Sequence, residues 1–138
     1  MAKEGFINHW KKATENPDDA RFAYAKKINE TDKVVFSKTL AKSEWENIDL
    51  ANGDLAEEIN RLKSQKGKDI IAYGGANFAS NLIEQNLIDE LQLFVNPVAI
   101  GEGMKIFHGR TNLLLEKSIP FSCGINILIY KPSKKINK

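Results

Sequence analysis

The chain has little cysteine, little histidine and no excess of charge of either sign. Its 138 residues include one cysteine, Cys123, and two histidines. An internal disulfide is therefore excluded, and no metal site is expected because His9 and His108 lie far apart without a ligand cluster. The chain has 20 basic and 18 acidic residues, a net charge of +2, which gives no general case for binding nucleic acid. No apolar run approaches the ~20 residues that a membrane span needs.

The same scarcities bear on location and domain organisation. The first residues, MAKEGFINHW, lack the apolar core of a secretion signal. Cys123 lies in the apolar stretch FSCGINILIY, so we expect a buried structural thiol rather than a nucleophile. Together these features favour a cytoplasmic protein. We expect one domain over residues 1–132 and a solvated basic tail over residues 133–138.

In the first half of the chain, hydrophobic spacing predicts helices and short strands. Helical spacing and start signals such as Pro17, Asp18 and Asp54 mark the helices. Short β-branched or alternating runs mark the strands. The expected helices span 4–14, 16–32 and 55–65, the last ended by Gly67, and the expected strands are 33–37 and a short one at Ile48 and Leu50.

The second half predicts a strand, a helix and three further strands. Residues 69–73, DIIAY, are continuously apolar enough for a strand buried on both faces. Phe78 to Leu87 has helical spacing, whereas Leu91, Leu93 and Val95 alternate on one face of a strand that stops at Pro97. A glycine-containing loop follows, and then LLLEKSIPF and GINILIYKP as an antiparallel pair. This order predicts an α/β fold with a mixed sheet.

Two strand ends carry residues that suit phosphate. Gly74 and Gly75 follow the strand at 69–73 and precede a helix, where free backbone N–H groups and the helix dipole attract anions. Ser37, Lys38 and Thr39 follow the strand at 33–37 with two hydroxyls and a cation. Ordinary turn chemistry and an ordinary polar loop remain open as alternatives. Two such ends would suit a ligand with separated phosphates, such as a dinucleotide.

The stretches VVFSKTL, GDLAEE to KIF, and the closing strands resemble the dihydrofolate reductase-like superfamily. The nearest branch is the C-terminal reductase domain of the riboflavin-biosynthesis deaminase–reductase. The resemblance implies a three-layer α/β/α mixed sheet and a homodimer. It also implies an NADPH-dependent reductase of a pterin-like or pyrimidine-like substrate, similar either to dihydrofolate reductase or to 5-amino-6-(5-phosphoribosylamino)uracil reductase.

The resemblance also implies residue roles for the cofactor NADPH. The Ser-Lys-Thr element would bind the 2′-phosphate, with lysine as the cation. The Gly-Gly pair would carry a cis peptide bond and contact the pyrophosphate, with the following helix start beside it. The cofactor-binding residues expected on this basis are Ser37, Lys38, Thr39, Gly74, Gly75, Ala76, Asn77 and Phe78.

The same resemblance implies that two central strands of the sheet are missing. Family members begin earlier and place two strands in the middle of the sheet before the residues that match Glu4, Gly5, Phe6 and Trp10 here. We therefore expect a truncated chain without those central strands, or one whose annotated start is wrong. The alternatives are that the remaining strands close together or that another chain fills the gap. We name no catalytic residue. The alternative is a non-catalytic remnant that keeps a nucleotide-binding surface or dimerises through GINILIY as an edge strand.

Overall fold

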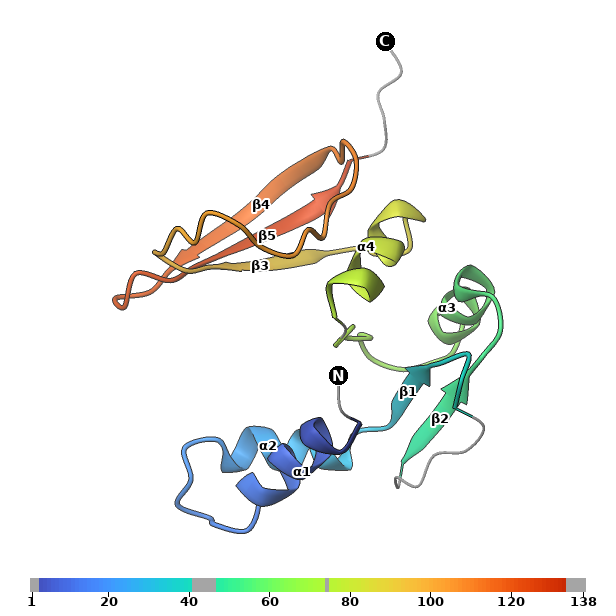
Figure 1. Cartoon of the computed structure of the whole chain (residues 1–138), viewed down its shortest axis with the longest axis vertical. Helices are drawn as coiled ribbons and strands as arrows, with labels where there is room; N and C mark the ends of the chain where they lie inside the picture. Colours follow the sequence, from blue (N-terminus) through green and yellow to red (C-terminus); the bar gives the residue numbers. More distant parts are fainter. Residues whose placement is uncertain (1–2, 41–46, 74, 134–138) are drawn as a thin grey trace. The chain divides into compact units, whose positions relative to one another are not determined.

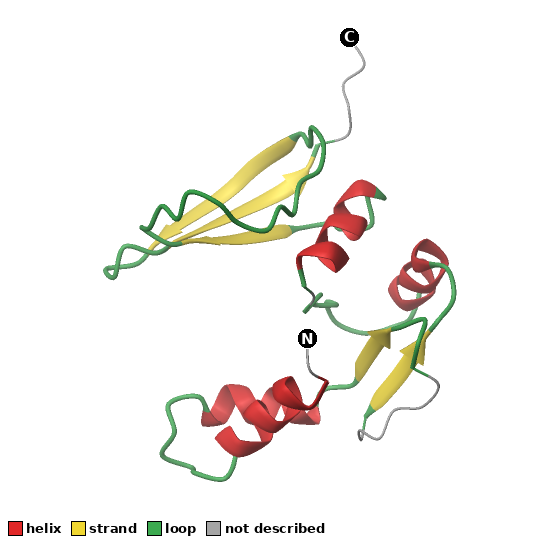
Figure 2. Cartoon of the chain, in the orientation of Figure 1, coloured by secondary structure: helices red, strands yellow, loops and turns green. Residues whose placement is uncertain are grey.

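The computed structural model describes residues 3–40, 47–73 and 75–133, and of residues 3–7 only the backbone. These residues fall into two compact units, divided between Leu55 and Ala56. Both units contain helices and strands (Figures 1 and 2), so the predicted α/β class is confirmed. Within the described residues, no helix is long and apolar enough to cross a bilayer.

Unit 1 begins with two packed helices, α1 (Lys3–Ala13) and α2 (Phe22–Glu30). Ala13 and Ala25 are buried, and small side chains of this kind let two helix backbones approach closely. The Trp10 ring meets the Tyr24 ring edge to face at a centroid distance of 5.2 Å. Trp10 is thus a packing residue between α1 and α2, and the helix predicted at 4–14 is confirmed.

Helix α2 begins later than predicted, because side chains before it hold the backbone in turns. Asn16 Oδ1 accepts a hydrogen bond from the Asp18 N–H at 3.1 Å. Asp19 Oδ1 accepts one from the Arg21 N–H at 2.8 Å. Local bonds of this kind compete with the helical pattern, so Pro17 and Asp18 belong to the connection between the helices and not to the first turn of α2.

Two parallel strands complete unit 1: β1 (Lys33–Phe36) and β2 (Ile48–Ala51). They pair in register from Lys33 opposite Ile48 to Phe36 opposite Ala51. The Ser37 N–H then donates to the Ala51 carbonyl oxygen at 3.0 Å, so the pairing extends one residue beyond β1. Both predicted strands are confirmed.

Helix α3 (Leu55–Lys63) directly follows Asp54 as predicted, and from Ala56 on it belongs to unit 2. Ile59 is buried on its apolar face. The helix ends four residues before Gly67, where residues 64–67 form turns and bends. Lys63 Nζ lies 2.6 Å from Asp89 Oδ2, an ion pair between the last turn of α3 and the residues that precede β3.

The strand predicted at 69–73 is wrong. These residues have no regular secondary structure, and Ile70, Ile71 and Tyr73 are exposed. A strand forms only where its backbone N–H and C=O groups are hydrogen-bonded to a neighbouring strand. No described strand pairs with 69–73. Apolar composition alone therefore does not make this segment a strand.

Helix α4 (Ala76–Glu84) and the turn after it carry the most buried apolar side chains of unit 2, Leu82 and Ile83 in the helix and Leu87 beyond it. Asn86, two residues after the helix, has a left-handed backbone at φ 55°. The Leu87 N–H reaches back to the Leu82 carbonyl oxygen at 2.9 Å, an arrangement that satisfies the last free carbonyls of a helix. The predicted helix is confirmed.

Three antiparallel strands form the sheet of unit 2: β3 (Leu91–Val95), β4 (Leu113–Pro120) and β5 (Asn126–Pro132). Their order is β3-β5-β4, so β5 is central (Figure 1). The antiparallel pair of late strands and the common face of Leu91, Leu93 and Val95 are confirmed by the register.

The central position of β5 corrects one expectation. GINILIY is not an edge strand, because both of its edges already pair with neighbours. The described strands form one two-stranded parallel sheet and one three-stranded antiparallel sheet. A three-layer arrangement around one mixed sheet with missing central strands stays a prediction.

A tight turn joins β4 to β5 and corrects the expectation for Cys123. The Gly124 N–H donates to the Phe121 carbonyl oxygen at 2.9 Å, and the Phe121 N–H donates to the Ile125 carbonyl oxygen at 2.8 Å. Cys123 lies within this turn and is exposed, not buried. Turn residues lie at the surface whatever the polarity of the strands beside them.

We predict that Gly124→Ala destabilises the fold by about 1–2 kcal/mol, because Gly124 has φ 90° and an added Cβ would lie 3.0 Å from Pro97 Cγ. Urea unfolding followed by circular dichroism measures the change. Gly109→Ala is the matched control, since a Cβ there meets no described atom within 4 Å. Equal unfolding free energies for the two variants would contradict the prediction.

Candidate functional site

The turn after β1 gathers the first three predicted cofactor-binding residues. Ser37 is fixed at the strand end by its backbone bond to β2. Its Oγ accepts hydrogen bonds from the Thr39 N–H at 3.3 Å and from the Leu40 N–H at 3.2 Å. This local bonding closes the chain into a compact turn. Lys38 and Thr39 are exposed on that turn.

The bonding of this turn leaves donors available at its surface. Because Ser37 Oγ already accepts two N–H bonds, its own O–H is left to donate. Thr39 Oγ1 lies 3.5 Å from Ser37 Oγ, so one of the two hydroxyls can donate a long hydrogen bond to the other. No ion pair joins Lys38 to another described residue, so within 3–40, 47–73 and 75–133 its ammonium group is available. Two hydroxyls and a cation on one turn form a group of donors that suits a phosphate.

The start of α4 contains the second group of predicted cofactor-binding residues, of which Gly75 to Phe78 are described. Gly75 is the residue before the helix, with an extended backbone at φ −69° and ψ 170°, and no side chain caps the helix. Its carbonyl oxygen accepts bonds from the Phe78 N–H at 3.0 Å and the Ala79 N–H at 3.1 Å. The N–H groups of Ala76 and Asn77 have no acceptor among the described residues. They carry the positive end of the helix dipole.

Open space surrounds Gly75, since a Cβ built there would meet nothing within 4 Å. A ligand can therefore approach the backbone at this point. Asn77 is exposed, and its carbonyl oxygen accepts from Ser80 Oγ at 3.0 Å and Asn81 Nδ2 at 2.8 Å. Gly74 lies outside the described residues, as does the cis peptide bond expected between Gly74 and Gly75.

The structure brings Ser37, Lys38 and Thr39 together in one turn, and it brings Gly75, Ala76, Asn77 and Phe78 together at one helix start. The turn belongs to unit 1 and the helix start to unit 2. That one ligand spans both groups stays a prediction.

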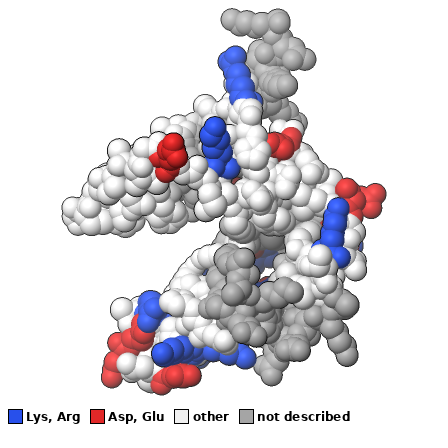
Figure 3. Space-filling model, viewed as in Figure 1, with Lys and Arg blue, Asp and Glu red and all other residues white. Residues whose placement is uncertain are grey.

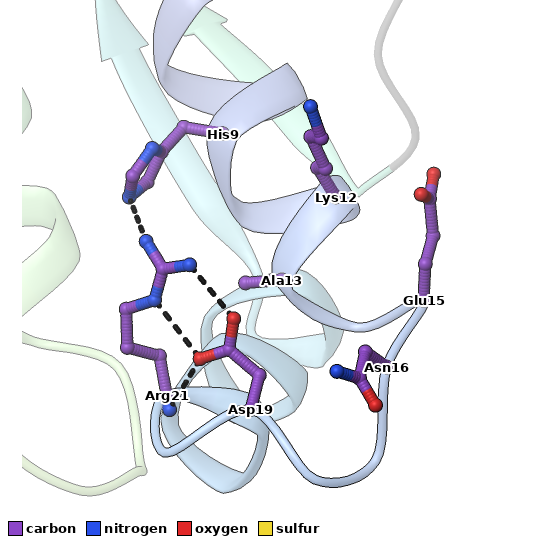
Figure 4. A pocket seen from close by; sticks show the side chains of 7 residues that line it. All are labelled: His9, Lys12, Ala13, Glu15, Asn16, Asp19 and Arg21. Carbon is purple, nitrogen blue, oxygen red and sulfur yellow. Dashed lines mark hydrogen bonds and ion pairs between the residues drawn. The ribbon is translucent and has the colours of Figure 1, made fainter.

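A surface hollow of about 470 Å³ lies in unit 1 beside the connection between α1 and α2, where sequence patterns indicated no site. Figure 4 shows the Arg21 guanidinium between Asp19 and the His9 ring. Arg21 Nη2 lies 2.7 Å from Asp19 Oδ2, and Arg21 Nη1 lies 3.5 Å from His9 Nε2. The remaining lining residues are Lys12, Ala13, Glu15 and Asn16.

The carboxylate in this hollow is held in its charged form. Side-chain and backbone hydrogen bonds from Arg21 lower the pKa of Asp19 from 3.8 to about 2. Asp19 in turn raises the pKa of Arg21. The two charges neutralise each other, which leaves no net positive site for an anion. We therefore interpret this cluster as a clamp on the helix connection.

Charged side chains of both signs are mixed over the face seen in Figure 3. No broad patch of one sign is visible there, in agreement with the net charge of +2. An anionic ligand would therefore be held by local donors and not by a general field of the protein.

Comparison with known sequences gives one family and several relatives. The protein-family model described as RibD C-terminal domain matches residues 6–127. The uncharacterized protein YyaP of Bacillus subtilis (strain 168) is 35% identical over 119 residues, which cover 84% of this chain and 62% of YyaP. The riboflavin biosynthesis protein RibD of Corynebacterium ammoniagenes is 32% identical over 78 residues, 45% of this chain and 23% of that protein. The chain thus spans about three fifths of YyaP.

A solved structure supports the fold. It is a crystal structure of a protein of Shewanella sp. PV-4 whose assignment to riboflavin biosynthesis is provisional. The TM-score is 0.63, with 91% of this chain and 88% of that chain covered. The sequence identity is 17%, so this likeness concerns the fold alone.

We predict that the Asp19 clamp makes stability depend on acid pH. Because its pKa is lower in the folded chain than in the unfolded chain, Asp19 contributes stability above about pH 4, and the contribution is lost as pH falls through about 2. Asp19→Asn should therefore lower the unfolding free energy at pH 6 and have little effect near pH 2.

Urea unfolding at pH 6, 4 and 2 measures this difference. Asp18→Asn is the control, because the Asp18 carboxylate makes no hydrogen bond or ion pair with another described residue. An Asp19→Asn effect that stays constant from pH 6 to 2 would refute the clamp.

Proposed function

The chain belongs to the RibD C-terminal domain family, as its sequence resemblance predicted, and from this premise we propose that it is an NADPH-dependent reductase. Its substrate would be pterin-like or pyrimidine-like, similar to that of the riboflavin-biosynthesis reductase or of dihydrofolate reductase. The relative from Corynebacterium ammoniagenes is named for riboflavin biosynthesis, which favours the pyrimidine-like class. The proposal extends to a cytoplasmic location and to a homodimer.

The start of α4 is the observation that carries this proposal. Ala76 and Asn77 offer two N–H groups without described acceptors, beside a glycine with open space around it. A pyrophosphate bound there would meet backbone donors and the positive end of the helix dipole. Placement of the Gly-Gly pair directly before the helix is what lets the phosphate oxygens reach the main chain.

The turn after β1 supports the preference for the additional phosphate of NADPH. Lys38 would neutralise the 2′-phosphate, while the Ser37 and Thr39 hydroxyls donate hydrogen bonds to it. A lysine supplies charge without the planar fork of an arginine, so the hydroxyls would fix the orientation. NADH lacks this phosphate and would leave the three donors without their ligand.

The cofactor, when bound, supplies a hydride to the substrate. The chain's own residues hold the cofactor's phosphates at the turn and at the helix start, and this fixes the position of the reactive ring. The described residues offer donors for phosphate at both places. We assign no catalytic acid among them.

A non-catalytic nucleotide-binding protein is the second candidate. The observation that favours it is segment 69–73, which leads to the glycine pair without belonging to a sheet and exposes Ile70 and Ile71. A cofactor loop held less rigidly could bind nucleotide without aligning it for reaction. NADPH oxidation assayed with pterin-like and pyrimidine-like substrates distinguishes the two, since this candidate predicts binding without turnover.

We predict that the chain binds NADPH more tightly than NADH and that Lys38→Ala removes this preference. The affinity for NADPH should fall about ten-fold or more, because hydrogen bonds to charged groups contribute about 1.5–3 kcal/mol. The affinity for NADH should change little. Fluorescence titration of the purified chain measures both constants.

Lys27→Ala is the matched control for this titration, because Lys27 lies in the last turn of α2, before the start of β1 and not at its end. A Lys38→Ala variant that keeps the full preference for NADPH would contradict the role of Lys38. Equal and negligible binding of both cofactors would overturn the proposed function as a whole.

We also predict that Asn77→Asp weakens NADPH and NADH binding alike by about ten-fold, because a carboxylate at the start of α4 repels the pyrophosphate that both cofactors share. The same change should leave stability unchanged or slightly higher, since acidic residues favour helix N-termini. Cofactor titration and thermal unfolding test the two effects together. Asn60→Asp in α3 is the control, and a loss of affinity equal in both variants would argue against the site.

A further inference from the structure

Ser37 holds the turn after β1 through both its backbone and its side chain. Its N–H donates to the carbonyl oxygen of Ala51 on β2 at 3.0 Å, and Ala51 is buried. Its Oγ accepts hydrogen bonds from the Thr39 N–H at 3.3 Å and from the Leu40 N–H at 3.2 Å. This one residue therefore connects the sheet of unit 1 to the backbone of the turn. Lys38 lies between the two sets of bonds.

The bonds to Ser37 Oγ also decide which donors the turn can offer to a phosphate. The N–H groups of Thr39 and Leu40 are directed to the serine oxygen, so they are not available to a ligand in this conformation. The start of α4 differs, because no side chain caps the first N–H groups of that helix. The turn after β1 therefore has to hold a phosphate mainly through side chains, above all that of Lys38.

A lysine distinguishes one phosphate position from another only if its backbone is fixed. The ammonium group sits on a flexible stem of four carbons. Because Ser37 bonds to the backbone on both sides of Lys38, the stem starts from a fixed point. If the turn opened, the ammonium group would spread over a larger volume, and its effective concentration beside the phosphate would fall.

We propose that Ser37 is a positioning residue for Lys38, an inference that rests on the proposed function. The serine oxygen closes the turn as a hydrogen-bond acceptor, and the closed turn places Lys38 and Thr39 where the 2′-phosphate of NADPH binds. The selectivity for NADPH over NADH then depends on the acceptor atom that shapes the turn, in addition to the donors that meet the phosphate.

Side-chain chemistry predicts which residues can replace Ser37. Threonine keeps the hydroxyl oxygen, and the side-chain oxygen of asparagine accepts a backbone N–H bond two residues further on in turns of the same kind. Alanine has no acceptor. The expected order of selectivity for NADPH is therefore serine and threonine first, asparagine next and alanine last.

We predict that Ser37→Ala lowers the ratio of NADPH to NADH affinity about five-fold and changes the affinity for NADH little. Ser37→Thr and Ser37→Asn should restore most of the ratio. In a Lys38→Ala background, Ser37→Ala should have little further effect, because the side chain that it positions is absent. Fluorescence titration of the full chain with each cofactor measures the ratios. Loss of folded protein would reduce the binding of both cofactors equally and would leave the ratio unchanged.

The turn itself is tested without any cofactor. Hydrogen exchange rates and NMR temperature coefficients of the Thr39 and Leu40 amides report their hydrogen bonds to Ser37. Both amides should exchange faster in Ser37→Ala and return towards the original rates in Ser37→Thr and Ser37→Asn. Ser64→Ala is the matched control, because the Ser64 hydroxyl donates to the Arg61 carbonyl oxygen at 2.7 Å just after α3. It should change neither the two amides nor the affinity ratio.

Unchanged Thr39 and Leu40 amides in Ser37→Ala would refute the inference, whatever the cofactors do. Faster exchange with an unchanged affinity ratio would also refute it. So would a Ser37→Asn variant that restores the amides and not the ratio, or an equal loss from Ser37→Ala with and without Lys38, because Ser37 would then act through its own bond to the phosphate. An unmodified chain that binds neither cofactor would overturn the proposed function, and this inference with it. The unmodified chain thus distinguishes failure of the site from failure of its positioning residue.

Discussion

Pairing of backbone N–H and C=O groups is the constraint on which this structure depends. β5 has a neighbour on each side, and the sheet of unit 2 is built around it. Residues 69–73 are at least as apolar, yet they have no described strand beside them and remain irregular with Ile71 exposed. An unpaired buried backbone group costs about 1–3 kcal/mol. Hydrophobicity therefore decides which segments can form strands, and pairing decides which of them do.

The same constraint determines where the chain can bind an anion. Donors remain free where regular structure ends, because the last groups of a strand or the first groups of a helix have no partner within the element. At Ser37 the ladder with β2 stops and the side chain itself closes the turn. At Gly75 the helix begins without a side-chain cap. These two ends combine a fixed backbone with available donors, a combination that neither the sheets nor the helix interiors offer.

Sequence patterns predicted the elements that are stabilised locally and failed where partners decide. Helices α1, α3 and α4, strand β1 and the β4–β5 pair follow from spacing and turn residues, which the chain carries in itself. The start of α2 was missed because Asn16 and Asp19 bond to nearby N–H groups before the helix begins. The state of 69–73 and the central place of β5 depend on strand order, which no local pattern contains. Exposure of Cys123 depends on a turn of a few residues inside an apolar run.

Strand β4, at one edge of the antiparallel sheet, is protected against pairing with a further strand. On β4, Glu116 pairs with Lys131 of the neighbouring strand at 2.7 Å, and this ion pair lies beside the register irregularity. A second strand that docked there would have to meet charged side chains and a distorted ladder. β3 carries no charged residue and pairs with β5 in a continuous register. Phosphate donors lie instead at strand and helix ends, where the backbone turns away from the sheet. The donors proposed for phosphate and the charges that protect the β4 edge therefore belong to different residues.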